Sequence, residues 1–178
     1  MSAAIAAEPR PHGDLLERLR QGIAAEPGGV LEEIARREGA SYREVLDALP
    51  DGQAIAKPGS AFEEVWATLA EWPGEITFIV HTGDGVFETR GRVPPGKAGR
   101  GFFNIHGETP IGGHIRADRC AAIYFVDRPF FGRRSCSVQF VNQEGEAMFK
   151  IFVGRDAARE LDARQVSLFE AATRSGEP

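Results

Sequence analysis

The chain has 178 residues, of which 42% are hydrophobic and 26% are charged, and its formal net charge is −5. This composition is typical of a soluble globular protein with a buried core, and the negative charge argues against general binding to nucleic acid or to an anionic membrane. No apolar run approaches the roughly 20 residues that a membrane-spanning helix needs, and the first residues lack the basic and apolar regions of a secretory signal. The sequence therefore predicts a cytoplasmic protein without membrane insertion.

The N-terminal third is predicted to be helical after a disordered leader at residues 1–13, which are small, contain proline and show no periodicity. A first helix is indicated by apolar residues at helical spacing, namely Leu15, Leu16, Leu19 and Ile23. A second helix is expected to end at Gly39. A third is expected to begin at Ser41, because Glu44 completes an S-x-x-E capping box.

A linker and a fourth helix are predicted next. Residues 50–59 are rich in Pro, Gly and Asp, which is typical of a connecting segment. Ser60 and Glu63 form a second S-x-x-E box, and an apolar stripe follows at Phe62, Val65, Trp66 and Leu69. This pattern predicts an amphipathic helix that ends at residues 72–74.

From Ile76 the apolar period changes to two, which predicts β-strands. We expect strands at residues 76–81, 85–91, 101–106, 111–116, 120–126, 137–142 and 147–153. Short turns that carry Gly or Pro join them, so successive strands should be antiparallel. Asp156 is expected to cap a last helix.

The predicted fold is α+β, with N-terminal helices packed on a large antiparallel β-sheet and a closing C-terminal helix. We expect a single domain over residues 14–173, made of a helical part (14–73), the antiparallel sheet (76–153) and the C-terminal helix (156–173).

Several common chemistries find little support. The would-be recognition helix of a helix-turn-helix, residues 42–49, offers Arg43 but also Glu44 and Asp47, which favours a structural helix pair. Cys120 and Cys136 lack metal-site spacing, and Cys136 alternates like an ordinary strand residue. No phosphate-binding glycine loop opens a helix after a strand.

Three of the four histidines fall in the predicted β-rich part. His81 ends the apolar run ITFIVH, and His106 and His114 lie in the stretch RGFFNIHGETPIGGHIR. The Gly112-Gly113 pair before His114 leaves space for a flat neighbour, and Phe102 and Phe103 lie close by in sequence. A metal-centred flat cofactor would suit this pattern, and hydrogen-bonded structural histidines would suit it equally. Zinc is a weaker alternative because no Asp or Cys completes a ligand set.

The chain resembles the HutX/ChuX family of cytosolic haem-utilisation carrier proteins. The resemblance is carried by the segments FIVHTGDGVFETRG, RGFFNIHGETPIGGHIRADRCAAIYFVDRPFFGR and SVQFVNQEGEAMFKIFVGRDAAREL. It also includes EPGGVLEEIARREGASYREVLDALP and FEEVWATLAEWPGEITFIVH, so it is collinear over nearly all of residues 15–170.

The resemblance implies a small α+β homodimer that binds haem in the cytoplasm. Two histidines that the ChuX branch uses for haem match His81, in FIVHT, and His114, in GGHIR, whereas His106 matches no family ligand. These two are the expected iron ligands. The other expected haem-binding residues are Phe102, Phe103, Gly112, Gly113 and Arg116, and further cations that could meet the haem propionates are Arg90, Lys97 and Arg100.

The expected function is that of an intracellular haem carrier, which binds and transfers haem rather than catalysing a reaction. A haem importer and a haem-degrading enzyme are the expected partners. The alternative is an enzyme that degrades haem with oxygen and a reductant. A flavin-binding split-barrel protein, which would be yellow, and a helix-turn-helix regulator, which would bind DNA in a salt-sensitive way, are the remaining alternatives.

Overall fold

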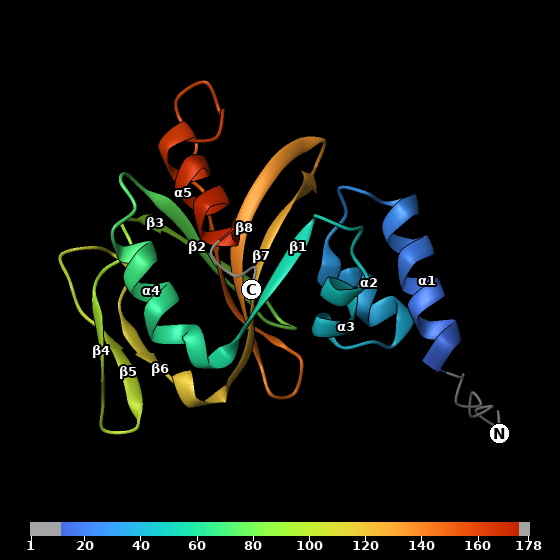
Figure 1. The fold of residues 1–178 in the computed structure, drawn as a ribbon, viewed down its shortest axis with the longest axis horizontal. Helices are drawn as coiled ribbons and strands as arrows, with labels where there is room; N and C mark the ends of the chain where they lie inside the picture. The colour runs from blue at the N-terminus through green and yellow to red at the C-terminus, as the bar shows by residue number, and fades with distance from the viewer. Residues whose placement is uncertain (1–11, 175–178) are drawn as a thin grey trace.

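The structure is a computed structural model that describes residues 12–174. Within this range, the strands form two antiparallel sheets, one of six strands in the order β1-β7-β8-β9-β2-β3 and one of three in the order β4-β5-β6 (Figure 1). The first sheet contains β1 (Ala54–Pro58), β2 (Ile76–His81), β3 (Val86–Gly91), β7 (Cys120–Phe130), β8 (Arg133–Asn142) and β9 (Ala147–Phe152). The second contains β4 (Gly96–Gly99), β5 (Phe102–Ile105) and β6 (Gly113–Ile115).

The helices confirm the predicted N-terminal group and the closing C-terminal helix, and the fourth helix lies between β1 and β2. The α-helices are α1 (His12–Ala25), α2 (Leu31–Glu38), α3 (Tyr42–Asp47), α4 (Phe62–Ala70) and α5 (Ala163–Arg174). Two short 3₁₀ helices are η1 (Gly59–Ala61) and η2 (Ala117–Arg119). Between residues 12 and 174, no helix is long and apolar enough to cross a membrane.

The six-stranded sheet separates two hydrophobic cores because its side chains alternate between its faces. On β7, Ile123 and Phe125 belong to a core with α4, α5 and the three-stranded sheet, whereas Tyr124 and Val126 belong to a core with α1–α3. Figure 1 shows the same division, with α1–α3 beyond one side of the sheet and α4, α5 and the small sheet on the other.

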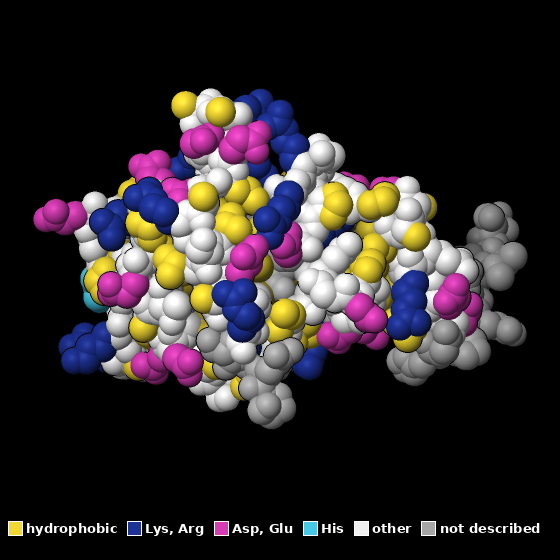
Figure 2. Space-filling model, turned by 45° about the horizontal axis from the view of Figure 1, so that its top comes forward, with side chains coloured by type: hydrophobic (Ala, Val, Ile, Leu, Met, Phe, Trp, Pro, Cys, Tyr) yellow, Lys and Arg dark blue, Asp and Glu magenta, His cyan; other side chains and the backbone are white. Residues whose placement is uncertain are grey.

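The core under α4 is aromatic. Phe62 packs edge-on against Phe103 and Phe140 with ring centroids 5.2 Å apart in both pairs, and Phe140 stacks on Phe149 at 4.4 Å. The smaller core against α1–α3 is aliphatic, and its buried members include Leu19, Ile34, Val45 and Leu46. On the outer surface, acidic and basic side chains are interspersed over the face drawn in Figure 2.

Local signals identified α3 correctly. Ser41 accepts a hydrogen bond from the backbone N–H of Glu44, and the Glu44 carboxylate accepts one from the backbone N–H of Ser41, so the predicted capping box is confirmed. Gly39 ends α2 with a φ of 68°, as expected of a C-terminal glycine.

Several predicted boundaries were wrong, and β7 and β8 are longer than the strands predicted at 120–126 and 137–142. Part of the predicted linker at residues 50–59 is β1, which pairs with β7 at the sheet edge. The box at Ser60 does not cap a helix, because residues 59–61 form η1 and α4 begins at Phe62. No strand was predicted between residues 91 and 101, but β4 begins at Gly96 and pairs with β5, so the strands divide into two sheets. The last helix begins at Ala163 rather than near Asp156. The predicted leader, residues 1–13, lies almost wholly outside the described residues.

Candidate functional site

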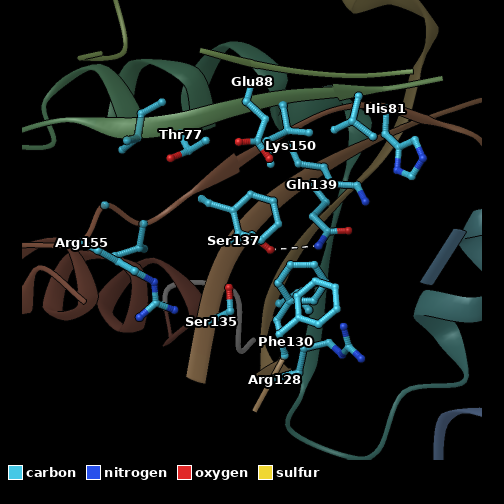
Figure 3. A pocket seen from close by; sticks show the side chains of 18 of the residues that line it. Thr77, His81, Glu88, Arg128, Phe130, Ser135, Ser137, Gln139, Lys150 and Arg155 are labelled. Carbon is cyan, nitrogen blue, oxygen red and sulfur yellow. Dashed lines mark hydrogen bonds between the residues drawn. The ribbon is translucent and has the colours of Figure 1, made fainter. Parts of the chain in front are cut away.

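A pocket of about 650 Å³ lies on the face of the six-stranded sheet that also carries α1–α3 (Figure 3). Strand alternation places polar and apolar side chains from five strands on its floor, among them Thr77, Ile79, His81, Val86, Glu88, Arg90, Arg128, Phe130, Ser135, Ser137, Gln139, Lys150 and Phe152. One wall is formed by the start of α2 and the residue before it, and it includes Glu32. Another wall is formed by the segment after β9, which includes Arg155 and Arg159. The pocket is therefore formed jointly by the helical part and the sheet.

His81 is the predicted ligand that faces this pocket. It is the last residue of β2, and its Nδ1 lies 2.9 Å from Oε1 of Glu32 on α2. A carboxylate oxygen only accepts, so Nδ1 is the protonated nitrogen and the neutral ring keeps its lone pair on Nε2. Metal-binding histidines are commonly held this way, by a carboxylate on the nitrogen that does not bind the metal.

Glu32 also pairs with Lys150, a buried residue of β9. Burial lowers the pKa of the Lys150 ammonium, while the charge of Glu32 and its hydrogen bond act in the opposite direction. The Lys150 Nζ atom also lies 4.5 Å from the centroid of the Tyr42 ring. One carboxylate thus connects the histidine, a buried cation and the helical wall.

Neutral polar groups line the middle of the floor. The hydroxyl of Tyr42 donates to Oε1 of Gln139 over 2.5 Å, and Nε2 of Gln139 donates to the hydroxyl oxygen of Ser137 over 2.9 Å. Burial, reinforced by the charge of Glu32, raises the pKa of the Tyr42 hydroxyl well above its usual value. These three side chains are hydrogen-bonded to one another without a ligand.

Arg128 is a buried cation that forms no ion pair with a carboxylate of residues 12–174. Only 6% of the residue is exposed, and its Nη2 donates to the backbone carbonyls of Pro27 and Gly29 over 2.8 and 3.1 Å. Its Nε has no hydrogen-bond partner among the described residues. Burial lowers the pKa of this guanidinium. A buried donor without a partner is costly, so this position favours an anionic ligand group.

Aromatic and aliphatic side chains form the apolar part of the lining. The rings of Phe130 and Phe131 have centroids 4.5 Å apart, and those of Phe130 and Phe152 are 6.4 Å apart. Ile79 and Val86 line the pocket from β2 and β3. The pocket thus combines apolar surface, an anchored histidine and a buried cation, which is a suitable combination for a flat amphiphile with anionic groups.

His114 lies elsewhere, on β6 of the three-stranded sheet, and it does not line this pocket. Its exposed ring contacts Phe102 edge-on at a centroid distance of 6.0 Å, and the Arg116 guanidinium lies 5.8 Å from the centroid of the Phe102 ring. Its Nδ1 is 2.7 Å from Oδ1 of Asn104. These side chains form a second histidine-bearing surface.

The glycines before His114 leave open space, as the sequence suggested. A Cβ added at Gly113 would meet no atom within 4 Å, and one added at Gly112 would come no closer than 3.9 Å to the carbonyl oxygen of Ile105. The φ of 140° at Gly113 is also one that other residues rarely adopt. The backbone conformation therefore favours glycine at position 113, while the space around both glycines would admit a Cβ.

Arg90, which was predicted as a cation for the haem propionates, lines the pocket together with His81, whereas the other predicted residues lie apart. Phe103 is buried in the aromatic core, where its ring packs against Phe62 and Trp66, so it offers no surface to a ligand. His106 is exposed, and its side chain has no hydrogen bond within residues 12–174. The structure therefore groups Phe102, His114 and Arg116, and places His81 in the separate pocket.

Most of the pocket residues were not predicted from the sequence. Glu32, Tyr42, Arg128, Gln139 and Lys150 were not predicted as site residues. The sequence gives little indication that Gln139 and Lys150 line a pocket, because the alternation in SCSVQF and FKIF is also that of a strand with one solvent-exposed face. The polar side chains of the sheet are enclosed only because α1–α3 pack against the same face of the sheet.

The chain has close relatives among known proteins. The model of the family described as haem utilisation ChuX/HutX matches residues 55–172. The intracellular heme transport protein HutX of Vibrio cholerae is 30% identical over 158 residues, which are 88% of this chain and 81% of that protein.

Two solved structures are similar in fold and sequence over most of their length. The heme-binding protein ChuX matches with a TM-score of 0.80 and 39% identity, over 88% of this chain and 97% of that one. A protein from Agrobacterium tumefaciens matches with a TM-score of 0.82 and 44% identity, over 96% of this chain and all of that one (100%). The likeness therefore includes the helical part as well as the sheets.

Proposed function

The chain belongs to the haem utilisation ChuX/HutX family, and from that premise we propose that it is an intracellular, non-catalytic haem carrier. The observation that carries this proposal is His81, with its Nδ1 anchored by Glu32, at a pocket of about 650 Å³. A carrier must hold haem firmly and still release it, and an imidazole ligand on a strand end suits both tasks.

The pocket residues fit haem in three respects. Nε2 of His81 would bind the iron, and Phe130, Phe131 and Phe152 would pack against the macrocycle. The unpartnered Nε of Arg128 favours a carboxylate, which is the chemistry of a haem propionate. Arg155 and Arg159 add positive charge in the wall after β9.

We propose His114 as the second haem ligand, with Phe102, Gly112, Gly113 and Arg116 around it. It lies on the other sheet. Its exposure suits contact with haem during uptake or release. We further propose that the protein acts in the cytoplasm as a homodimer, receiving haem from an importer and passing it to a haem-degrading enzyme.

The test is a haemin titration followed by visible absorption, with His81→Ala, His114→Ala and the control His106→Ala. We expect a saturable Soret shift in the wild-type protein and in the control, weakened in both other variants. The proposal fails if the wild-type protein gives no saturable shift. Ascorbate added to the complex tests the alternative: a stable Soret band supports carriage, and bleaching with iron release supports haem degradation.

A further inference from the structure

The side-chain amide of Asn104 is fixed in one orientation by its surroundings. Its Nδ2 lies 3.2 Å from the carbonyl oxygen of Lys97, 3.0 Å from that of Gly99 and 3.2 Å from that of Phe102. Carbonyl oxygens only accept hydrogen bonds, so the nitrogen of this amide must face them. The amide oxygen is therefore forced to the other side, toward His114.

This orientation determines the tautomer of His114. Oδ1 of Asn104 is 2.7 Å from Nδ1 of His114 and can only accept, so Nδ1 carries the proton. The lone pair of the neutral ring is then on Nε2. A free histidine in water prefers the opposite tautomer, with the proton on Nε2, and that form cannot bind iron through Nε2.

The small sheet is arranged to hold this contact. Asn104 on β5 and His114 on β6 are directly paired residues. The turn between β4 and β5 passes through Arg100 and Gly101, which have φ angles of 55° and 79°. This turn places the carbonyls of Gly99 and Phe102 around the Asn104 amide, so an uncommon backbone conformation supports the amide and the amide supports the histidine.

We propose that Asn104 is a positioning residue for haem binding, which holds His114 in the tautomer that presents Nε2 to iron. The proposal rests on the haem-binding function proposed above. It adds a residue that touches no haem atom and acts through His114. In both histidines, Nδ1 donates to an oxygen of another side chain. That oxygen belongs to a carboxylate for His81 and to a neutral amide for His114.

The first test needs no haem. Long-range ¹H–¹⁵N NMR of the histidine rings in the apoprotein reports which nitrogen carries the proton. We expect the Nδ1–H tautomer for His114 in the wild-type protein, where the Asn104 amide oxygen accepts from it. We expect the Nε2–H tautomer in Asn104→Ala, while the exposed His106 serves as an internal reference. An Nε2–H tautomer of His114 in the wild-type protein would overturn the proposal.

The second test is a double-mutant cycle for haemin affinity. Loss of a supporting residue commonly weakens metal binding about 10- to 100-fold, so we expect a loss in this range for Asn104→Ala. In a His114→Ala background, Asn104→Ala should have no further effect, because the role of Asn104 depends on the ring. An equal loss in both backgrounds would assign Asn104 a structural role instead and overturn the proposal.

The two tests separate the possible failures. If the wild-type protein binds no haemin, the proposed function fails, although the NMR experiment still decides the tautomer. If it binds haemin but His114→Ala binds as tightly, His114 is not a ligand and the positioning role is overturned.

Discussion

At the scale of single residues, both tyrosines of the chain are buried in hydrogen-bonded positions. Tyr42 donates to Gln139 in the pocket floor, and Tyr124 donates to Oδ1 of Asp47 over 2.6 Å. Burial raises the pKa of Tyr42 well above its usual value. Burial and the Asp47 carboxylate together raise the pKa of Tyr124 to about 12. Both phenols therefore stay neutral in the folded protein near pH 10, where a free phenol ionises.

This predicts an alkaline limit to stability. The unfolded chain releases these protons near pH 10, whereas the folded chain holds them. The stabilisation is complete below pH 10 and is lost as the pH rises toward 12, at up to about 1.4 kcal/mol per pH unit for each tyrosine. Ultraviolet absorbance should show tyrosinate appearing together with the loss of circular dichroism. Tyr42→Phe should leave Tyr124 as the only tyrosine, so that the tyrosinate signal reports on it alone. Tyrosinate that forms near pH 10 in a folded protein would contradict the prediction.

At the scale of secondary-structure elements, Glu32 fastens α2 to two strands of the sheet, through His81 on β2 and Lys150 on β9. Glu32→Gln leaves a buried ammonium without its partner, which should lower the free energy of unfolding by about 3 kcal/mol in urea denaturation. Adding Lys150→Met should restore most of that stability, because a buried ion pair can often be replaced by apolar packing.

Haemin affinity should behave differently from stability in the same variants. Glu32→Gln combined with Lys150→Met should bind haemin more weakly than Lys150→Met alone, since a neutral amide holds Nδ1–H of His81 less strongly than a carboxylate does. Lys150→Met alone, which keeps Glu32 on His81, should bind nearly normally, and the exposed Glu33→Gln is the matched control on the same helix. If Lys150→Met weakens binding as much as the double variant, Glu32 does not act through His81.

Two similar sequence patterns show how far the elements could be predicted. The S-x-x-E box at Ser41 does cap α3, because all of its partners are local. The same pattern at Ser60 does not cap a helix. The adjacent Gly59 lies against β7, where an added Cβ would be 1.9 Å from the carbonyl oxygen of Cys120. Pairing of β1 with β7, a contact distant in sequence, determines that backbone.

The candidate site was also only partly predictable from the sequence. The chemistry of His81 and His114, together with the family resemblance, marked them as ligand candidates. The two histidines lie on different sheets because β4, β5 and β6 form a separate sheet, and local sequence patterns did not predict that separation. Gln139 and Lys150 alternate with apolar residues, as solvent-facing strand residues also do, and only tertiary packing shows that they line a pocket.

At the scale of the whole molecule, the pocket depends on how α1–α3 dock on the sheet. Leu46 on α3 and Leu69 on α4 are both 1% exposed, and neither lines the pocket. Leu46 belongs to the core that holds α1–α3 on the sheet, and Leu69 belongs to the core on the opposite face. The two leucines therefore form a matched pair for testing whether docking of the helical part controls haem retention.

We expect Leu46→Ala and Leu69→Ala to destabilise the protein by similar amounts, about 3 kcal/mol each, because both leave a cavity in a tight core. Only Leu46→Ala should let α1–α3 detach while the sheet stays folded, since stability is not uniform across a structure. Hydrogen exchange should then speed up selectively in α1–α3, and haemin should pass faster to an excess of a scavenging globin. Leu69→Ala should retain haemin at the wild-type rate. Equal rates of haemin loss in the two variants would mean that α1–α3 do not hold haem in the pocket, and that release is governed by the sheet and His81 alone.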